Sequence, residues 1–384
     1  MKHRMMSLSL CVALTACAAA PLAPTPEHLF ADARFAPPSQ RIDPGEVLAL
    51  SAAMREYAAK DMAPLLRMRG MQQGLIDALY TRGKLKLEYD SALTRNATQA
   101  FDARAGNCLS LVIMTAAFAK HLGMPVRYQS VLIDPTWSRE GDLYFASSHV
   151  NLSLAKRPTE ARVGFDASHL LTIDFLPPED VQGHRTRDVS EQTIIAMYMN
   201  NRAAESLARG RLDDAYWWAR EALFQAPDFL RSANTLAVIY LRHGNLPEAE
   251  QALTHVLARE PHNAQALSNL TRVLQAQGRS EDAAHVAKQL AQLELHPPFY
   301  FYNLGRAALE AGDSRNASEW FAREIERDAY HHEFHFWRAV ALFDLGQFEA
   351  AVQHMAKAKQ YSPTRVLSER YTAKLEHLRA HRVQ

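Results

Sequence analysis

The stretch AVIYLRHGNLPEAEQALTHVLAREP, residues 237–261, contains four landmarks that recur along the second half of the chain. A small residue, Ala237, lies seven positions before Gly244. Ala249 follows the glycine after five positions and Pro261 follows it after seventeen. The glycine recurs every 34 residues, at Gly210, Gly244, Gly278, Gly312 and Gly346. A period of this length indicates an array of repeated helical units.

The landmark residues suit a pair of packed helices. A glycine allows the left-handed turn that ends the first helix, and small residues let the two helices approach closely. Proline ends the unit because it cannot continue a helix. One helix pair cannot bury its apolar face alone, so the units must stack. The recurring positions are the alanines 215, 249, 283, 317 and 351, the small residues Ala203, Ala237, Thr271, Gly305 and Ala339, and the prolines 227, 261 and 363, with Leu295 and Ala329 replacing proline in the third and fourth units.

This pattern resembles the tetratricopeptide repeat over five units, from about residue 196 to residue 365. The resemblance implies an all-α superhelix over residues 190–365 whose groove binds a protein or peptide partner. Residues 366–384 begin with apolar and charged side chains alternating at helical spacing. We expect them to form a polar capping helix and a tail.

The N-terminus has the features of a secretory signal. Lys2, His3 and Arg4 precede a short apolar stretch that is too short to span a bilayer. The stretch ends in Leu-Thr-Ala-Cys17, which resembles the lipobox of bacterial lipoproteins. The resemblance implies cleavage before Cys17, a lipid on its sulfur and, with Ala18 following, a place on the periplasmic side of the outer membrane. An ordinary signal peptide cut nearby is the alternative.

Residues 18–43, which follow this 1–17 signal, are rich in alanine and proline and predict an extended, poorly packed tether. Beyond the signal no apolar run approaches the length of a membrane span. The formal net charge of the 384 residues is +1, without a basic cluster, so nucleic acid is not an expected partner. The membrane is expected to be contacted only through the lipid.

Cys108 is the cysteine most relevant to function. Cys11 lies in the discarded signal and Cys17 would carry the lipid, so Cys108 cannot form an internal disulfide in the mature chain. Good helix formers run from Leu109 to Leu122, and Gly123 ends the expected helix. The thiol would therefore lie at a helix N-terminus, where the positive end of the dipole stabilises a thiolate.

Two later segments read as strands that carry a histidine and an acid. His149 lies near the start of the first, and Asp174 ends the second. This order resembles the transglutaminase-like superfamily over residues 44–189. The resemblance implies an α+β domain in which Cys108 is the nucleophile, His149 the general base and Asp174 the residue that orients the imidazole. Asp166 is a rival acid; we favour Asp174 because a stronger apolar strand precedes it.

Such a site would hydrolyse amides or transfer acyl groups through a thioester, without cofactor or metal. The competing hypothesis is a non-enzymatic adaptor in which the first domain supports the repeats. His331 and His335 share a helix face, but two imidazoles without a third ligand more often mark repeat surface than zinc. The sequence thus predicts an α+β transglutaminase-like domain followed by an all-α tetratricopeptide superhelix.

Overall fold

The computed structural model describes residues 24–81, 85, 87–90, 93–131, 136–140, 143–147, 149–155, 170–175, 185–293 and 296–381. The predicted signal with Cys17 and the rival acid Asp166 lie outside these residues. Within the described part of the chain, every helix is too short or too polar to cross a bilayer.

A group of short helices begins the α/β domain. Helix α1 (Ala52–Tyr57) continues through the single π-turn η4 (Ala58–Met62) into α2 (Ala63–Arg69), and α3 (Met71–Ile76) continues into the π-turn η5 (Asp77–Thr81). Gly70, with φ of 79°, breaks the helix between α2 and α3. At Gly74 a Cβ would lie 2.7 Å from the Leu66 Cα, so the absence of a side chain lets α3 pack directly on α2.

Helix α5 (Cys108–His121) is the centre of this domain. It follows α4 (Ala97–Ala103), and eleven of its residues, from Leu109 to Ala119, are buried. The sequence predicted this helix within one residue at each end. Leu122 and Gly123 end it, and Gly123 has a φ of 70°.

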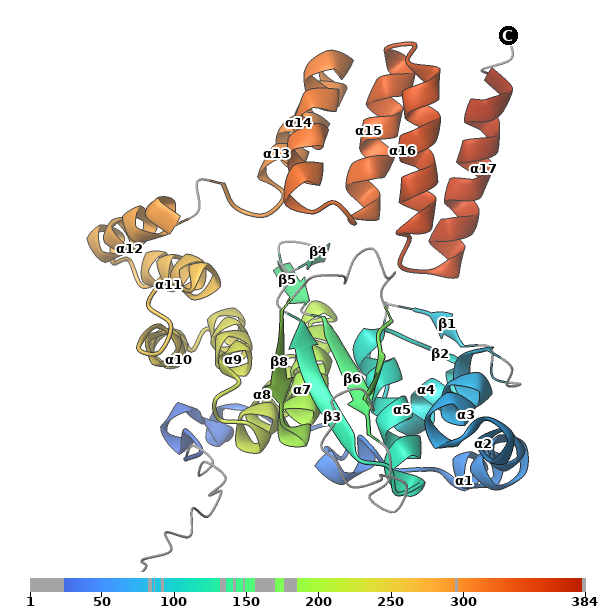
Figure 1. Ribbon diagram of the computed structural model, residues 1–384. Helices are drawn as coiled ribbons and strands as arrows, with labels where there is room; N and C mark the ends of the chain where they lie inside the picture. The colour runs from blue at the N-terminus through green and yellow to red at the C-terminus, as the bar shows by residue number, and fades with distance from the viewer. Residues whose placement is uncertain are drawn as a thin grey trace, which may run out of the picture.

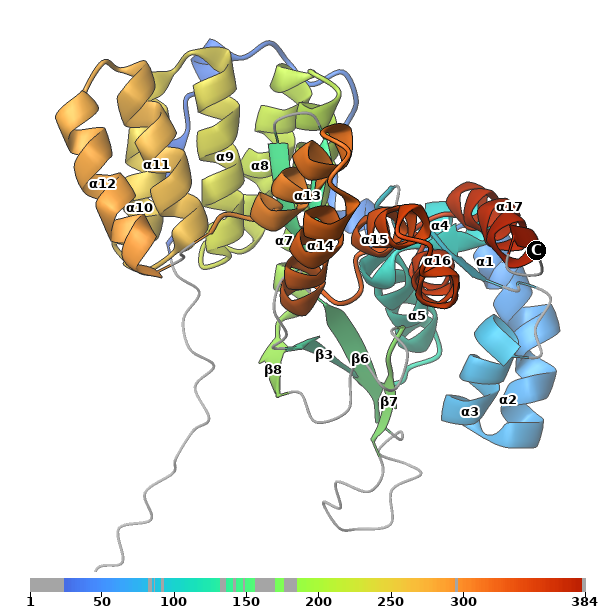
Figure 2. The same cartoon turned by 90° about the horizontal axis from the view of Figure 1, so that it is seen from above.

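A four-stranded antiparallel sheet packs against α5 (Figure 1), and its strands lie in the order β7-β6-β3-β8 (Figure 2). Its strands are β3 (Val126–Val131), β6 (Val150–Leu154), β7 (Leu171–Ile173) and β8 (Thr186–Val189). Two smaller sheets join β1 (Glu88–Tyr89) to β2 (Ala105–Gly106) in parallel and β4 (Thr136–Glu140) to β5 (Leu143–Ser147) in an antiparallel hairpin. All five residues of β6 are buried, so it forms the inner strand against the helix.

The C-terminal part is all-helical, as the sequence predicted. The helices are α7 (Glu191–Ala208), α8 (Leu212–Gln225), α9 (Leu230–His243), α10 (Leu246–Leu257), α11 (Ala264–Ala276), α12 (Ser280–Leu293), α13 (Tyr300–Glu310), α14 (Ser314–Arg327), α15 (His332–Asp344), α16 (Phe348–Gln360) and α17 (Arg365–His381). Each repeat glycine has a positive φ, for example 86° at Gly244, and ends the first helix of its pair. At Gly305 a Cβ would lie 2.7 Å from the Phe321 ring, which explains the small residue there.

The helices fall into two bodies rather than one continuous stack (Figure 2). The core of the α/β domain continues through α7–α11, from Leu29 to Val273. Buried residues of α13–α17 form separate clusters, one of them around Phe299 and Phe334. Phe299 begins the second body with a left-handed φ of 63°, directly after two prolines, and this local geometry redirects the chain before α13.

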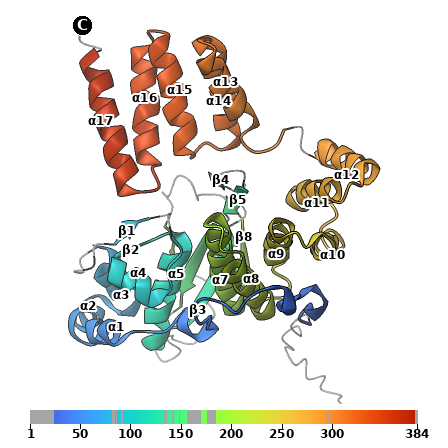
Figure 3. The same cartoon turned by 180° about the vertical axis from the view of Figure 1, so that it is seen from behind.

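The N-terminal segment is packed against the repeats, so the prediction of a poorly packed tether is wrong for residues 27–39, which we call the strap. The strap passes along α8 and α9 before the chain continues to α1 (Figure 3). Leu29 is 2% exposed and Phe35 is 7% exposed. The Phe35 ring stacks on Tyr216 with 4.0 Å between ring centroids.

Backbone groups of the strap find partners on the repeat helices. The Ala31 N–H donates to the Tyr216 hydroxyl at 2.9 Å, and the Ser39 N–H donates to the Asp214 carboxylate at 2.7 Å. The Tyr240 hydroxyl donates to the Leu29 carbonyl at 2.7 Å. Composition suggested a loose segment here because proline and alanine carry few polar groups. The acceptors and aromatic surfaces that hold it lie far along the chain.

Candidate functional site

Cys108 is the first residue of α5, and the turn before it is closely packed. Asn107 caps the helix: its side-chain oxygen accepts hydrogen bonds from the Ser110 N–H at 2.9 Å and the Ser110 hydroxyl at 2.8 Å. Gly106 lies in β2, where a Cβ would approach the Ser110 Cβ to 2.7 Å. Only glycine therefore fits beside the cap. The half-buried thiol is held at the positive end of the helix dipole.

His149 and Asp174 lie on adjacent antiparallel strands. His149 directly precedes β6, and Asp174 directly follows β7. The pairing of Leu152 with Ile173 brings the two ends together, and the His149 Nε2 lies 2.6 Å from the Asp174 Oδ1. The imidazole is almost fully buried, with 4% of its side chain exposed. The carboxylate thus fixes the orientation of the ring.

Asn151 holds the second oxygen of the same carboxylate. Its side-chain amide donates to the Asp174 Oδ2 at 2.8 Å. Residues two apart on a strand share a face, so Asn151 and His149 both reach Asp174 from β6. The sequence reasoning missed this residue, although its position two residues after His149 on an expected strand was a usable signal.

The imidazole interacts with the thiol as well as with the acid. Burial is the largest influence and by itself lowers the pKa of His149, but hydrogen bonds to Asp174 and Cys108, and their charges, raise it to about 9. Because Nε2 is engaged by Asp174, Nδ1 is the ring nitrogen left for Cys108. The Asp174 carboxylate and the Cys108 thiol therefore both favour the protonated form of the ring.

The structure therefore brings Cys108, His149 and Asp174 together. They come from the start of one helix and the ends of two strands. Asp174 lies 66 positions after Cys108 in the sequence. Phe175 packs beside the group against the Tyr80 ring, with 5.4 Å between ring centroids. A thiol that contacts an imidazole, which in turn contacts a carboxylate, can be activated for attack on a carbonyl carbon.

The histidines of the fifth repeat form no such centre. His335 is buried, contrary to the expected surface position, and its Nε2 lies 2.9 Å from the Ala329 carbonyl oxygen. Its Nδ1 lies 2.9 Å from the Nδ1 of His354. Among the described residues no group of three or more histidine, cysteine or acidic side chains could hold a metal.

Comparison with known proteins identifies the repeats. Family models of the tetratricopeptide repeat match residues 240–297 and 302–365. Human tetratricopeptide repeat protein 7A is 32% identical over 102 residues, which are 27% of this chain and 12% of the human protein. This chain therefore spans only a small part of that relative.

Two solved structures that match part of the chain at low TM-scores are described as TPR proteins. A thermophilic TPR protein of Thermus thermophilus, TTC0263, is 20% identical, with a TM-score of 0.28 over 47% of this chain and 98% of the other. YrrB, described as a TPR protein with an unusual peptide-binding site, is 18% identical, with a TM-score of 0.25 over 46% of this chain and 92% of its own. The C-terminal part of this chain is a tetratricopeptide-repeat array.

Proposed function

We propose that the repeats bind a protein or peptide and that Cys108 attacks an amide carbonyl in the bound molecule. The observation that carries this proposal is the 2.6 Å contact between the His149 Nε2 and Asp174 while the same ring hydrogen-bonds Cys108. A lone packed cysteine would not require a buried imidazole held by a carboxylate. The proposed reaction is hydrolysis or acyl transfer.

The chemistry follows from these three groups. The Cys108 thiolate adds to the carbonyl carbon, and the oxyanion is stabilised by backbone N–H groups at the start of α5. The His149 imidazolium donates its Nδ1 proton to the departing amine nitrogen, the C–N bond breaks and a thioester remains. Water, or an acceptor amine, then loses a proton to His149 and attacks the thioester. The C–S bond breaks, an acid or a new amide leaves, and the Cys108 thiolate is restored beside the protonated His149.

The likeness to the transglutaminase-like superfamily supports this assignment at the level of motif order. A cysteine begins a buried helix, a histidine precedes one strand, and an acid follows the neighbouring strand. Asp174 is preferred to Asp166 as the acid because it accepts from both His149 and Asn151. Residues 44–189 remain our proposed extent of this unit.

We further propose that a lipid on Cys17 holds the protein on the periplasmic side of the outer membrane. The Leu-Thr-Ala-Cys17 motif and Ala18 support this location. In that aqueous compartment water is the abundant acceptor, which favours hydrolysis over transfer.

A non-catalytic adaptor is the second candidate. Both matching family models cover repeats rather than the Cys108 region, which favours a binding protein. In this alternative the α/β domain only extends the repeat surface. Removal of the thiol then leaves the cellular function intact.

Alkylation of Cys108 by iodoacetamide across a range of pH tests the proposed function. An ordinary thiol with a pKa of about 8.5 is only a few per cent thiolate at neutral pH. A thiol beside an imidazole that is held by a carboxylate attacks faster than such an ordinary thiol. We expect His149→Ala to slow alkylation at neutral pH by about 10-fold.

The matched control is His121→Ala, which removes an exposed histidine from the opposite end of α5. It should react at the parental rate. A parent protein that is alkylated only in alkali, with no response to His149→Ala, would leave the adaptor as the better account.

A further inference from the structure

The first repeat helix, α7, is packed into the α/β domain at both ends. Near its N-terminus, the Glu191 carboxylate accepts from the Lys120 Nζ at 2.5 and 2.7 Å and from the Tyr128 hydroxyl at 2.9 Å. Between the ends, Ile194 and Met199 lie in the same buried core as α5. Helix α7 is therefore part of the packing around the helix that carries Cys108.

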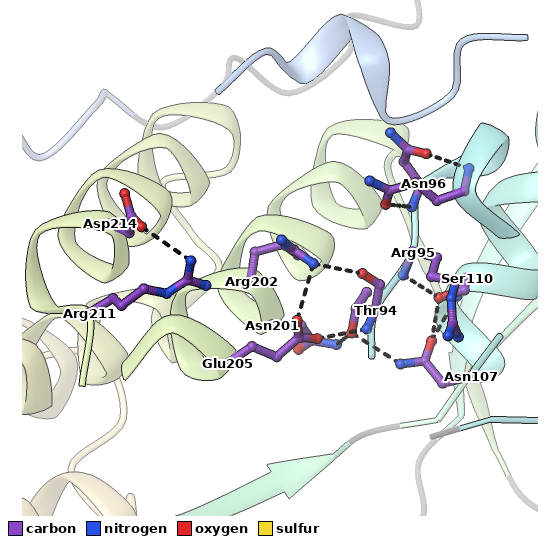
Figure 4. Close-up of polar contacts among 11 residues, drawn as sticks. Thr94, Arg95, Asn96, Asn107, Ser110, Asn201, Arg202, Glu205, Arg211 and Asp214 are labelled. Carbon is purple, nitrogen blue, oxygen red and sulfur yellow. Dashed lines mark hydrogen bonds and ion pairs between the residues drawn. The ribbon is translucent and has the colours of Figure 1, made fainter. Parts of the chain in front are cut away.

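The C-terminal half of α7 meets the domain at Thr94, a buried residue just before α4 (Figure 4). The Thr94 hydroxyl accepts from the Asn201 side-chain amide at 3.2 Å. The Thr94 N–H donates to the Glu205 carboxylate at 2.7 Å, and the Thr94 carbonyl accepts from Arg202 at 3.4 Å. Three polar residues of one helix thus converge on a single threonine.

The Glu205 carboxylate is held there at an electrostatic cost. Burial is the largest influence and raises the pKa of Glu205, while hydrogen bonds from the N–H and hydroxyl of Thr94 and the charge of Arg202 oppose this shift. Arg202 lies 3.2 Å from the carboxylate. Thr94 thus supplies hydrogen bonds that stabilise the charged form of this half-buried carboxylate.

On its other side Thr94 holds the cap of α5 (Figure 4). The Thr94 hydroxyl also accepts from the Asn107 side-chain amide at 3.0 Å. The oxygen of the same Asn107 side chain caps α5 through Ser110. Both ends of the Asn107 amide are therefore used, and its orientation is fixed by Thr94.

We propose that Thr94 and Asn201 are positioning residues for Cys108, so that the first tetratricopeptide helix completes the thiol site. This inference rests on the function proposed above. The path runs from Asn201 on α7 through the Thr94 hydroxyl to Asn107, the residue directly before the thiol. Without the hydroxyl, the Asn107 nitrogen loses its acceptor, the cap can rotate, and the start of α5 shifts relative to His149.

The test compares Thr94→Val with Thr94→Ser in the full chain. Valine keeps the shape but removes the hydroxyl, whereas serine restores it. We expect Thr94→Val to slow alkylation of Cys108 at neutral pH by about 3- to 10-fold, the effect of losing the one buried hydrogen bond that orients Asn107. The variant should also move the pH–rate profile of alkylation to higher pH. Thr94→Ser should remain within about two-fold of the parent.

A second pair of variants approaches from the repeat side. Asn201→Ala should change the profile in the same direction as Thr94→Val but by less, because the Thr94 hydroxyl remains as the acceptor for Asn107. Asn200→Ala is the matched control. In the described residues Asn200 makes no hydrogen bond to Thr94, and its side-chain oxygen has no partner. Circular dichroism and thermal unfolding identify any variant that fails to fold. If Thr94→Val or Asn201→Ala fails to fold, the other of these two variants tests the positioning role.

The outcomes separate the two proposals. A parent whose alkylation responds to His149→Ala but whose profile is unchanged by both Thr94→Val and Asn201→Ala overturns the positioning role alone. Equal slowing by Asn200→Ala and Asn201→Ala also overturns it, because general loosening of α7 would then suffice. A parent thiol that is indifferent to His149→Ala overturns the proposed function itself.

Discussion

Replacing Phe35 with alanine should release the strap from the repeats. The ring stacks on Tyr216 at 4.0 Å and lies 4.5 Å from the His243 ring and 5.8 Å from the Tyr240 ring. A buried phenylalanine removes about 200 Å² from water, which at about 25 cal/mol per Å² gives an upper limit of about 5 kcal/mol. Alanine keeps the Cβ, and the strap lies at the edge of the core, so we expect a loss of about 2–3 kcal/mol.

Urea unfolding followed by circular dichroism measures this loss as a lower midpoint. Hydrogen exchange adds a local measurement, since the N–H groups of Ala31 and Ser39 should lose protection when the strap detaches. The matched control is Arg41→Ala just beyond the strap, because this exposed side chain pairs with Asp43 two residues away. The reasoning is refuted if Phe35→Ala unfolds at the same urea concentration as Arg41→Ala and retains the protection of both amides.

Three further predictions concern other parts of the chain. Gly244→Val should cost about 1 kcal/mol or more, measured by thermal unfolding, because φ at Gly244 is 86°; an unchanged melting temperature would contradict the left-handed turn. The second concerns acid stability. Burial is the main cause that lowers the pKa of His335 and the pKa of His354, the latter to about 3. The free energy of unfolding that the neutral rings contribute above about pH 6.5 should therefore fall as the pH decreases from there towards 3. A melting temperature measured from pH 7 to pH 4 should show this fall, and His354→Gln should reduce it; a pH dependence identical to the parent would exclude the pair as its source. Finally, Cys17→Ala should abolish incorporation of radiolabelled fatty acid and leave the protein uncleaved or soluble; equal labelling of parent and variant would exclude lipidation at this residue.

The acid sensitivity has a specific cause in the histidine pair. The Ala329 carbonyl can only accept, so His335 donates from Nε2 and its Nδ1 is left as an acceptor for the His354 Nδ1–H. Protonation of His335 places two N–H groups against each other. The charges of Arg338 and Lys357 nearby oppose protonation further.

Local patterns were enough to predict the repeat helices and the helix after Cys108. Gly244 and Ala249 carry their structural reasons within a few residues, as a left-handed turn and a close helix contact. The strand that places His149 alternates polar and apolar residues, so its pairing with the strand before Asp174 could be expected. The resemblance of this motif order to the transglutaminase-like superfamily then nominated three side chains that lie together.

Other features depend on contacts that no short pattern encodes. The strap is held by Tyr216, more than 180 residues away. Thr94 has no motif of its own, because its role depends on Asn107 and Asn201 arriving from different elements. After α12 the non-glycine residue Phe299 adopts a positive φ just before α13, and no local motif predicted this conformation.

The strap also limits where the repeats can lie if Cys17 carries a lipid. Glu27, the start of the strap, is the tenth residue after Cys17. Even fully extended, such a segment reaches about 35 Å. The face of α8 and α9 that the strap covers would then lie near the bilayer surface, at a distance similar to the diameter of one small domain. Bulky partners would be excluded from that gap and would have to approach the protein from the side or from the compartment interior.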